Sequence, residues 1–170
     1  VEVGYSEDSR LDARFRVTKL LRDGKNTLAV KVFRYSDGSY MEDQDYWKYS
    51  GIERNVYIEE RAASRVEDYK LVAGLKDDFT NGDFALELKP NAGCKKGTKI
   101  KVEVLDGTKI VFEKLLSYRS AKDSLLSVLT TINKVKPWNA ETPNIYTLRV
   151  TTLTEQGKVA ESFAHKFGFR

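Results

Sequence analysis

The sequence predicts an all-β protein: an immunoglobulin-like antiparallel β-sandwich preceded by part of another β domain. Three observations predict this fold class. Apolar residues alternate with polar ones along most of the chain, which is the period of strands with one buried face. Glycine-containing pairs typical of tight hairpins separate the alternating segments. No segment has the length and the 3.6-residue period of an ordinary helix.

Residues 1–59 are expected to be the C-terminal part of the preceding β domain. Residues 1–5 look like a strand already under way, and residues 28–32 alternate as a further strand. A short helical turn is expected at 18–22, ended by an Asp-Gly pair. These strands are too few to close a sandwich, and we expect both ends of the chain to continue in a longer protein.

Residues 60–170 are expected to form the complete sandwich, with about seven strands between Asp68 and Phe167. Hairpin turns are predicted at Asn81-Gly82, at Asp106-Gly107 and around 155–157, where the residues tolerate positive φ. The apolar faces of the strands are Phe84, Leu86 and Leu88; Ile100, Val102 and Val104; Ile110 and Phe112; Tyr146, Leu148 and Val150; and Val159, Phe163 and Phe167.

Composition narrows the classes of function. The 29 basic residues exceed the 25 acidic ones by only four, and no apolar run approaches the roughly 20 residues of a membrane helix. Neither nucleic acid nor a membrane is therefore expected as a partner. The lysines at 95–101 could form a basic patch, but the strand alternation there fully explains them as a solvated hairpin rim, which is the expected role.

Histidine and cysteine each occur once, at His165 and Cys94. An internal disulfide and the spacing of a zinc site are therefore excluded. His165 occupies an apolar position of the last strand, and we expect it to be a packed residue. No glycine-rich phosphate loop or nucleophile elbow is present.

The loop 36–47, SDGSYMEDQDYW, is the densest candidate site. It holds four carboxylates and three aromatic residues within twelve positions. Carboxylates can bind a hard cation or accept hydrogen bonds from sugar hydroxyls, and aromatic rings offer flat apolar faces. Taken alone, the loop is better explained as an acidic surface loop pinned by Tyr46 and Trp47 than as a binding site. Asp43 and Asp45 could do glycosidic acid/base work only with a rigid opposing wall, which the sequence does not show.

Several motifs resemble the bacterial β-galactosidases of glycoside hydrolase family 2. They are VGYSEDSR at 3–10, GKNTLAV at 24–30, the stretch 34–56 with SDGSYMEDQDYW and SGIERNV, PWNAETPNIY at 137–146, and the final GFR. The resemblance spans essentially the whole chain. It implies the last third of a jelly-roll sugar-binding domain at 1–59 and the whole immunoglobulin-like domain at 60–170. A catalytic (β/α)₈ barrel would follow.

The resemblance also implies the roles of individual residues. The two catalytic glutamates of the family lie on the barrel, so no catalytic residue is expected in this chain. The second aspartate of the EDQDxW pattern, Asp45 here, is implied to bind sodium and the galactose 6-hydroxyl in the parent enzyme. Tyr46 replaces a methionine of similar members and leaves this ligand unchanged. No cofactor is expected in the fragment, whereas sodium and magnesium are expected for the parent.

The sequence thus predicts a non-catalytic accessory fragment of a retaining, homo-oligomeric β-galactosidase that hydrolyses terminal β-D-galactosides of the lactose type. Its implied partners are the substrate and the remaining domains. A family 2 β-glucuronidase or β-mannosidase remains an alternative, as does a free-standing carbohydrate-binding or interaction sandwich. The compartment stays open between cytoplasm and periplasm, with the cytoplasm favoured for the parent.

Overall fold

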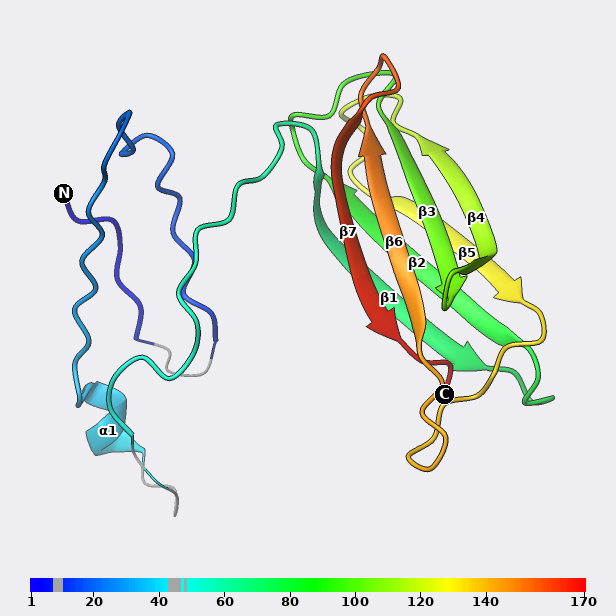
Figure 1. Cartoon of the computed structure of the whole chain (residues 1–170), viewed down its shortest axis with the longest axis horizontal. Coiled ribbons are helices and arrows are strands. Elements are labelled where there is room, and N and C mark those ends of the chain that lie inside the picture. Colours follow the sequence, from blue (N-terminus) through cyan, green and yellow to red (C-terminus); the bar gives the residue numbers. More distant parts are fainter. Residues whose placement is uncertain (8–10, 43–46, 48) are drawn as a thin grey trace. The chain divides into compact units, whose positions relative to one another are not determined.

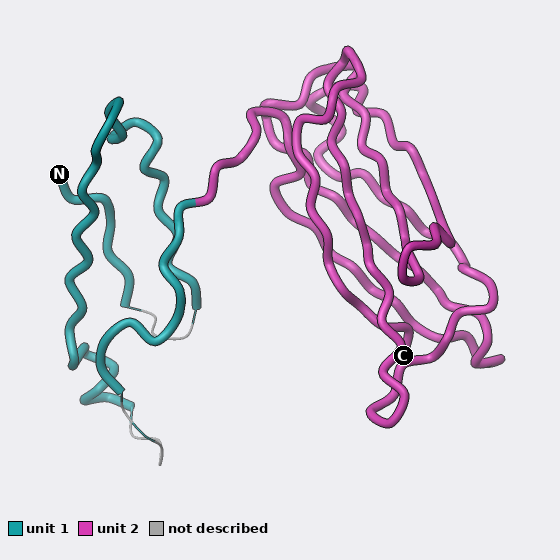
Figure 2. Tube along the Cα trace, in the orientation of Figure 1, with its two compact units in different colours: residues 1–58 teal, residues 59–170 magenta. Residues whose placement is uncertain are grey.

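The computed structural model describes residues 1–7, 11–42, 47 and 49–170. They form two compact units, which Figure 2 distinguishes by colour: unit 1, Val1–Ile58, and unit 2, Glu59–Arg170. The described residues of unit 1 contain one regular element, the helical turn α1 (Asp37–Met41), and no strand. The strands predicted at 1–5 and 28–32 are therefore wrong as regular elements.

A physical reason for this difference is the lack of partner strands. Leu28, Val30 and Val32 remain 57%, 56% and 47% exposed. A strand is stable only when neighbours accept its backbone hydrogen bonds and cover its apolar face, and the described residues of unit 1 provide no such neighbouring strands. Of the helical turn predicted at 18–22, a single turn forms, closed by the Leu20 N–H, which donates to the Val17 carbonyl at 2.8 Å.

Unit 2 contains seven strands, the number expected from the sequence (Figure 1). They are β1 (Val66–Leu75), β2 (Gly82–Pro90), β3 (Lys99–Asp106), β4 (Lys109–Ser117), β5 (Leu126–Ile132), β6 (Tyr146–Leu153) and β7 (Val159–Phe167). A three-stranded sheet has the order β1-β2-β5, and a four-stranded sheet has the order β4-β3-β6-β7. All pairs within these sheets are antiparallel. The predicted immunoglobulin-like sandwich is confirmed.

The core lies between the two sheets and follows the predicted alternation. Its centre comes from β2, β3 and β6, whose most deeply buried apolar side chains are at most 1% exposed: Phe84, Leu86, Leu88, Ile100, Val102, Val104, Leu148 and Val150. Each such burial contributes about 1.5–3 kcal/mol. A register shift after Val104 pairs Leu105 with Ile110, so Ile110 faces outward and is 44% exposed, whereas Phe112 packs on the core.

Two predicted turns are confirmed and one is shifted. Gly157 has φ 79° between β6 and β7, in the turn predicted around 155–157. Gly107 has φ 60° between β3 and β4, as the Asp-Gly pair requires. The β1–β2 turn instead places positive φ at Phe79, and the Asp78 carboxylate accepts the backbone N–H groups of Thr80 and Asn81 at 2.9 Å. Gly82 opens β2, where an added Cβ would lie 2.5 Å from the Phe169 ring. This glycine therefore serves packing rather than turn geometry.

The end of the sandwich where β6 begins is fixed by an aromatic residue. The Tyr146 hydroxyl accepts a hydrogen bond from the Lys136 backbone N–H at 2.8 Å. A tyrosine near the start of this strand that bonds to the preceding backbone is a hallmark of immunoglobulin-like domains. The Tyr146 ring meets the Phe169 ring edge-on at 5.2 Å, so the last residues of the chain close this end of the core.

The first residues of unit 2 are tied to β7 by a paired charge. Arg61 donates from Nε and Nη2 to the two Glu161 oxygens at 2.8 and 2.9 Å, and Nη2 also donates to the Val66 carbonyl at 2.9 Å. The Ala62 N–H adds a hydrogen bond to Glu161 at 3.2 Å. Arg61 holds the pKa of Glu161 below its ordinary value. The path of residues 59–66 across unit 2 is thereby fixed.

Candidate functional site

The candidate loop 36–47 begins with a stabilised helical turn. At the start of α1, the Ser39 N–H donates to the Ser36 carbonyl at 2.9 Å, and the Ser36 N–H donates to the Ser39 hydroxyl at 3.1 Å. Hydroxyl residues favour helix starts because they satisfy such backbone groups. The acidic part of the loop therefore follows a defined local structure. Asp45, the predicted sodium and galactose ligand, lies outside the described residues, as do Asp43 and Tyr46.

Large side chains around this loop are exposed. Tyr40, Met41 and Trp47 are 82%, 85% and 78% exposed. The Tyr40 ring lies 6.3 Å from the ring of Tyr35, over which the Arg34 guanidinium sits at 5.3 Å. Such flat apolar surfaces suit the face of a sugar ring or packing against another protein surface.

A second polar contact of unit 1 involves Tyr5. Its hydroxyl donates to the Glu7 carboxylate at 3.0 Å. This hydrogen bond raises the pKa of Tyr5, and the negative charges of Glu7 and Asp37 add to the effect. Tyr5 is therefore a neutral hydrogen-bond donor rather than an acid or base at physiological pH.

Unit 2 carries a buried carboxylate that sequence reasoning missed. Glu103 is 2% exposed on the outward side of β3, directly opposite Arg149 of β6. Arg149 donates to both Glu103 oxygens at 2.7 and 2.8 Å, and Lys101 Nζ lies 2.9 Å from Oε1. The hydrogen bonds from Arg149, more than those from Lys101, lower the pKa of Glu103 to about 2. Strand alternation places Lys101 and Glu103 on one face, but only the strand register brings Arg149 beside them, and no local pattern predicts that pairing.

This cluster does not suit glycosidic acid/base chemistry. Lys101 bridges Glu103 to Glu113, with Nζ 3.1 Å from the Glu113 carboxylate. A glycosidase needs one carboxyl group whose pKa is raised so that it can donate a proton. The pKa of Glu103 is shifted in the opposite direction. The cluster is therefore structural, and it also neutralises one lysine of the possible basic patch.

The single histidine and cysteine occupy different environments. His165 faces inward opposite Leu148, but β7 is an edge strand, so the ring is exposed at the rim and contacts Tyr69 edge-on at 5.8 Å. The expectation that His165 is a packed residue is therefore wrong. Cys94 is buried, with Sγ 3.4 Å from the Arg65 carbonyl. Among the described residues, no group of three or more His, Cys, Asp and Glu could hold a metal ion.

A hollow of about 530 Å³ in unit 2 lies along β1 and β7. Trp138 lines it, and the Arg170 guanidinium lies 5.7 Å from the Trp138 ring. Its lining is Leu71, Val72, Ala73, Gly74, Trp138, His165, Lys166, Phe167, Gly168 and Arg170, with no carboxylate side chain. It therefore lacks the carboxylate pair that glycoside hydrolysis needs.

In the described part of the chain, no helix is long and apolar enough to span a membrane.

Two family models match the chain almost end to end. Residues 1–61 match the sugar binding domain of glycosyl hydrolases family 2, and residues 64–170 match a further model of the same family. Curated relatives agree. The chain is 36% identical over 168 residues to a β-galactosidase of Clostridium acetobutylicum and 38% identical over 180 residues to β-galactosidase 2 of Enterobacter cloacae. Each alignment covers 99% of this chain but only 18% and 17% of the respective relative.

Solved structures show the same fold at lower identity. A β-glucuronidase of Parabacteroides merdae matches 64% of this chain with a TM-score of 0.53 and 23% identity, covering 14% of that chain. A family 2 member from Bacteroides cellulosilyticus matches 65% of this chain with a TM-score of 0.55 and 14% identity, covering 16% of that chain. At these identities the likeness concerns the fold alone. The two family matches together carry the assignment: the chain belongs to glycosyl hydrolase family 2.

Proposed function

We propose that this chain is a non-catalytic accessory portion of a retaining β-galactosidase that acts on terminal β-D-galactosides of the lactose type. The observation that carries the proposal is the alignment of 99% of the chain with curated β-galactosidases at 36–38% identity. Unit 1 would contribute to sugar binding, and unit 2 would be a spacer that fixes unit 1 against a catalytic barrel supplied by the parent enzyme.

The charges of unit 2 support a non-catalytic role for this portion. Retaining glycosidases need two carboxyl groups about 5–5.5 Å apart, one of them with a raised pKa. In the described part of unit 2, Glu103 and Glu161 are each held ionised by an arginine that binds both carboxylate oxygens. Both pKa values are lowered. These carboxylates stabilise the sandwich and are poor proton donors.

Asp45 is the residue proposed to reach the substrate in the parent enzyme. A carboxylate oxygen is a suitable ligand for a hard cation such as sodium and a suitable acceptor for the galactose 6-hydroxyl. The exposed Tyr40, Met41 and Trp47 are available to be covered once the barrel and the sugar lie beside the loop. Sodium and magnesium are the proposed ions of the parent, which we further propose to be a homo-oligomer.

The isolated chain should hydrolyse no β-galactoside. Purified chain is incubated with a chromogenic β-galactoside, and turnover that co-purifies with the chain would contradict the proposal.

Two further experiments test the alternatives. Calorimetric titration of the same sample with galactose tests for a free-standing carbohydrate-binding module, which requires measurable affinity without the barrel. The full-length enzyme is then compared on β-galactoside, β-glucuronide and β-mannoside. A preference for either of the latter two would replace the proposed substrate class.

The role of Asp45 is tested in the full-length enzyme with Asp45→Ala. A charge-assisted hydrogen bond contributes about 1.5–3 kcal/mol, so kcat/KM should fall about tenfold or more, and the response to sodium should weaken. Glu42→Gln, a carboxylate of the same loop, is the control and should leave both properties near those of the wild type. Unchanged kinetics together with an unchanged sodium response in Asp45→Ala would show that Asp45 binds neither the substrate nor sodium.

A further inference from the structure

Strand β5 is an unprotected sheet edge. It ends the order β1-β2-β5, so one side of its backbone has no neighbouring strand within the sheet. Native proteins protect such edges with charges, proline or a covering segment, because a free edge pairs with other chains. Of the four edge strands in the part of the chain that the structure describes, β5 alone carries no charged residue. The uncharged segment extends from 124 to 133.

The other three edges show the protection that β5 lacks. Each of β1, β4 and β7 carries at least two charged side chains. These residues are Glu67, Asp68 and Lys70 on β1; Lys109, Glu113 and Lys114 on β4; and Glu161 and Lys166 on β7. Charges at an edge oppose pairing because a second strand would bury them or place like charges opposite one another. The difference therefore singles out β5 as the edge fitted to a partner strand.

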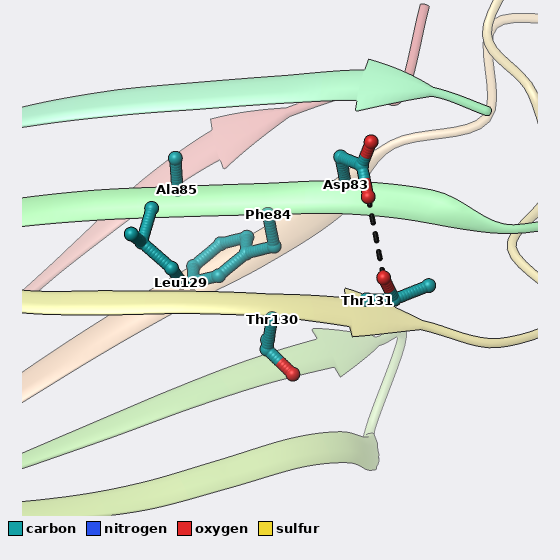
Figure 3. Close-up of a pocket in the computed structure, with 6 residues that line it drawn as sticks. All are labelled: Asp83, Phe84, Ala85, Leu129, Thr130 and Thr131. Carbon is teal, nitrogen blue, oxygen red and sulfur yellow. Dashed lines mark hydrogen bonds between the residues drawn. The ribbon is translucent and has the colours of Figure 1, made fainter.

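The outer side of this sheet is apolar where it reaches β5. The register aligns Val72, Ala85 and Leu129 in one row across the three strands. Leu129, at the open end of the row, is 79% exposed. Figure 3 shows Ala85 and Leu129 on the same side of the sheet, with Thr131 donating to Asp83 at 3.2 Å nearby. A hollow of about 260 Å³ lies here, lined by Asp83, Phe84, Ala85, Leu129, Thr130 and Thr131.

The sequence of β5 is complementary to a second copy of itself. When two β5 strands run antiparallel about a two-fold axis at Leu129, Leu129 meets Leu129 of the partner subunit. Ser127 then lies opposite Thr131 of the partner subunit, a favourable hydroxyl pair, and no charges are opposed. The 5% exposed Ile132 lies opposite Leu126 of the partner subunit, so both cores are extended. The apolar row continues across six strands.

We propose that β5 is a homodimer interface at which two copies of this chain form one six-stranded antiparallel sheet, centred on Leu129. A two-fold interface between identical copies is isologous, so the same β5 residues of both copies take part. Seven paired residues span about 23 Å, which makes the contact smaller than a standard interface. The dimer is therefore weak and forms at high protein concentration.

Cysteine pairing tests the register in the full chain. Directly opposed residues of antiparallel strands have Cα atoms about 4.5–5.5 Å apart, which a disulfide can span. Under mild oxidation, Leu129→Cys should give a covalent dimer. Ser127→Cys and Thr131→Cys should give little dimer separately and a covalent heterodimer when mixed. Leu115→Cys, on the outward side of edge strand β4 and 49% exposed, is the matched control and should stay monomeric.

Sedimentation equilibrium tests the energetics of the same contact. Leu129→Lys should raise the dissociation constant of the dimer about tenfold or more, because it would place two ammonium groups opposite one another. Leu115→Lys should leave the constant unchanged. Unfolding midpoints verify that both variants are folded, which is expected at exposed positions.

Three results would overturn the interface. One is a wild-type chain that stays monomeric at all concentrations while Leu129→Cys fails to cross-link. Another is a dimer whose stability Leu129→Lys does not change, which would place association on another surface, including that of residues 1–58. The third is Ser127→Cys cross-linking to itself as readily as Leu129→Cys, which would show non-specific contact.

Discussion

Glu103 is a buried carboxylate whose burial depends on its charged neighbours. A carboxylate that is 2% exposed would be costly to bury without partners. Arg149 provides two parallel hydrogen bonds from the neighbouring strand, and Lys101 provides a third contact from the same strand. A shift of β6 by one residue would move Arg149 to the other face of the sheet and leave Glu103 without the two hydrogen bonds from this arginine. The pair therefore favours the observed register of β3 and β6.

Glu103→Gln should lower the free energy of unfolding by about 1–3 kcal/mol at pH 7, because it removes the charge-assisted hydrogen bonds and leaves Arg149 without its carboxylate. Glu113→Gln is the matched control. Glu113 is half exposed and contacts only Lys101 of this group, so its loss should cost less than about 1 kcal/mol. Urea unfolding of the two variants measures both values. Equal losses would show that the burial of Glu103 is energetically unimportant.

The stability of the folded chain should depend on pH because Glu103 is stabilised in its ionised form. The pKa of Glu103 is lowered from 4.5 to about 2 in the folded chain. The contribution of Glu103 to the free energy of unfolding is therefore fully present above its pKa in the unfolded chain. It is lost as the pH falls through its pKa in the folded chain. Unfolding free energies of the wild type should fall between about pH 5 and pH 2, by about 3 kcal/mol from this group. Glu103→Gln should show a shallower decline, and parallel curves would contradict the assignment.

At the scale of elements, alternation predicted the strands of unit 2 because each has one buried face. Leu86 and Leu88, for example, lie in the core as the pattern required. Long-range contacts decided what alternation could not. Gly82 is required by the Phe169 ring rather than by a turn, and Phe79 takes the positive φ of the β1–β2 turn because Asp78 organises the following backbone. The wrong turn position reflects contacts that only the folded chain reveals.

The segment that enters unit 2 should be protected by its ion pair with β7. Glu161→Gln would weaken both hydrogen bonds from Arg61 and the one from Ala62, so residues 59–65 should be cleaved several-fold faster by a non-specific protease. Glu59→Gln is the control, since the 57% exposed Glu59 lies 3.6 Å from Arg61 and adds little. Mass spectrometry of early fragments locates the cuts. Equal cleavage rates in the two variants would show that the Arg61–Glu161 ion pair does not protect this segment.

At the scale of the whole chain, the sequence was sufficient to predict the sandwich but not to establish the role of the candidate loop. The sandwich followed from local patterns that its own core satisfies. The loop 36–47 depends on groups beyond its own turn: α1 forms from local serine hydrogen bonds, but Tyr40 and Trp47 remain exposed. The role of Asp45 therefore came from the family resemblance and stays a prediction. The unprotected edge of β5 needed the strand order, which no local pattern contains.

The two units should differ in their resistance to opening, and hydrogen exchange can measure this difference. Strands β2, β3 and β6 surround a core of side chains at most 1% exposed, and their amides pair within sheets. In unit 1 the described residues form no sheet, and Leu28 and Val30 are more than half exposed. Amides that lack sheet partners and buried neighbours exchange by low-energy local opening, whereas core strands exchange near the global unfolding free energy.

Amides of the strands between 84 and 167 should therefore be strongly protected, and those at 1–7 and 11–35 should exchange within seconds to minutes under the same conditions. Measurement at low protein concentration, where the chain is monomeric, keeps association from adding protection. Adding denaturant below the unfolding midpoint provides the control, because it should speed exchange in the strands while leaving 1–35 nearly unchanged. Equal protection of both units in the monomer would mean that residues 1–58 bury a core of their own. The apolar side chains at 28–32 would then have partners within this chain.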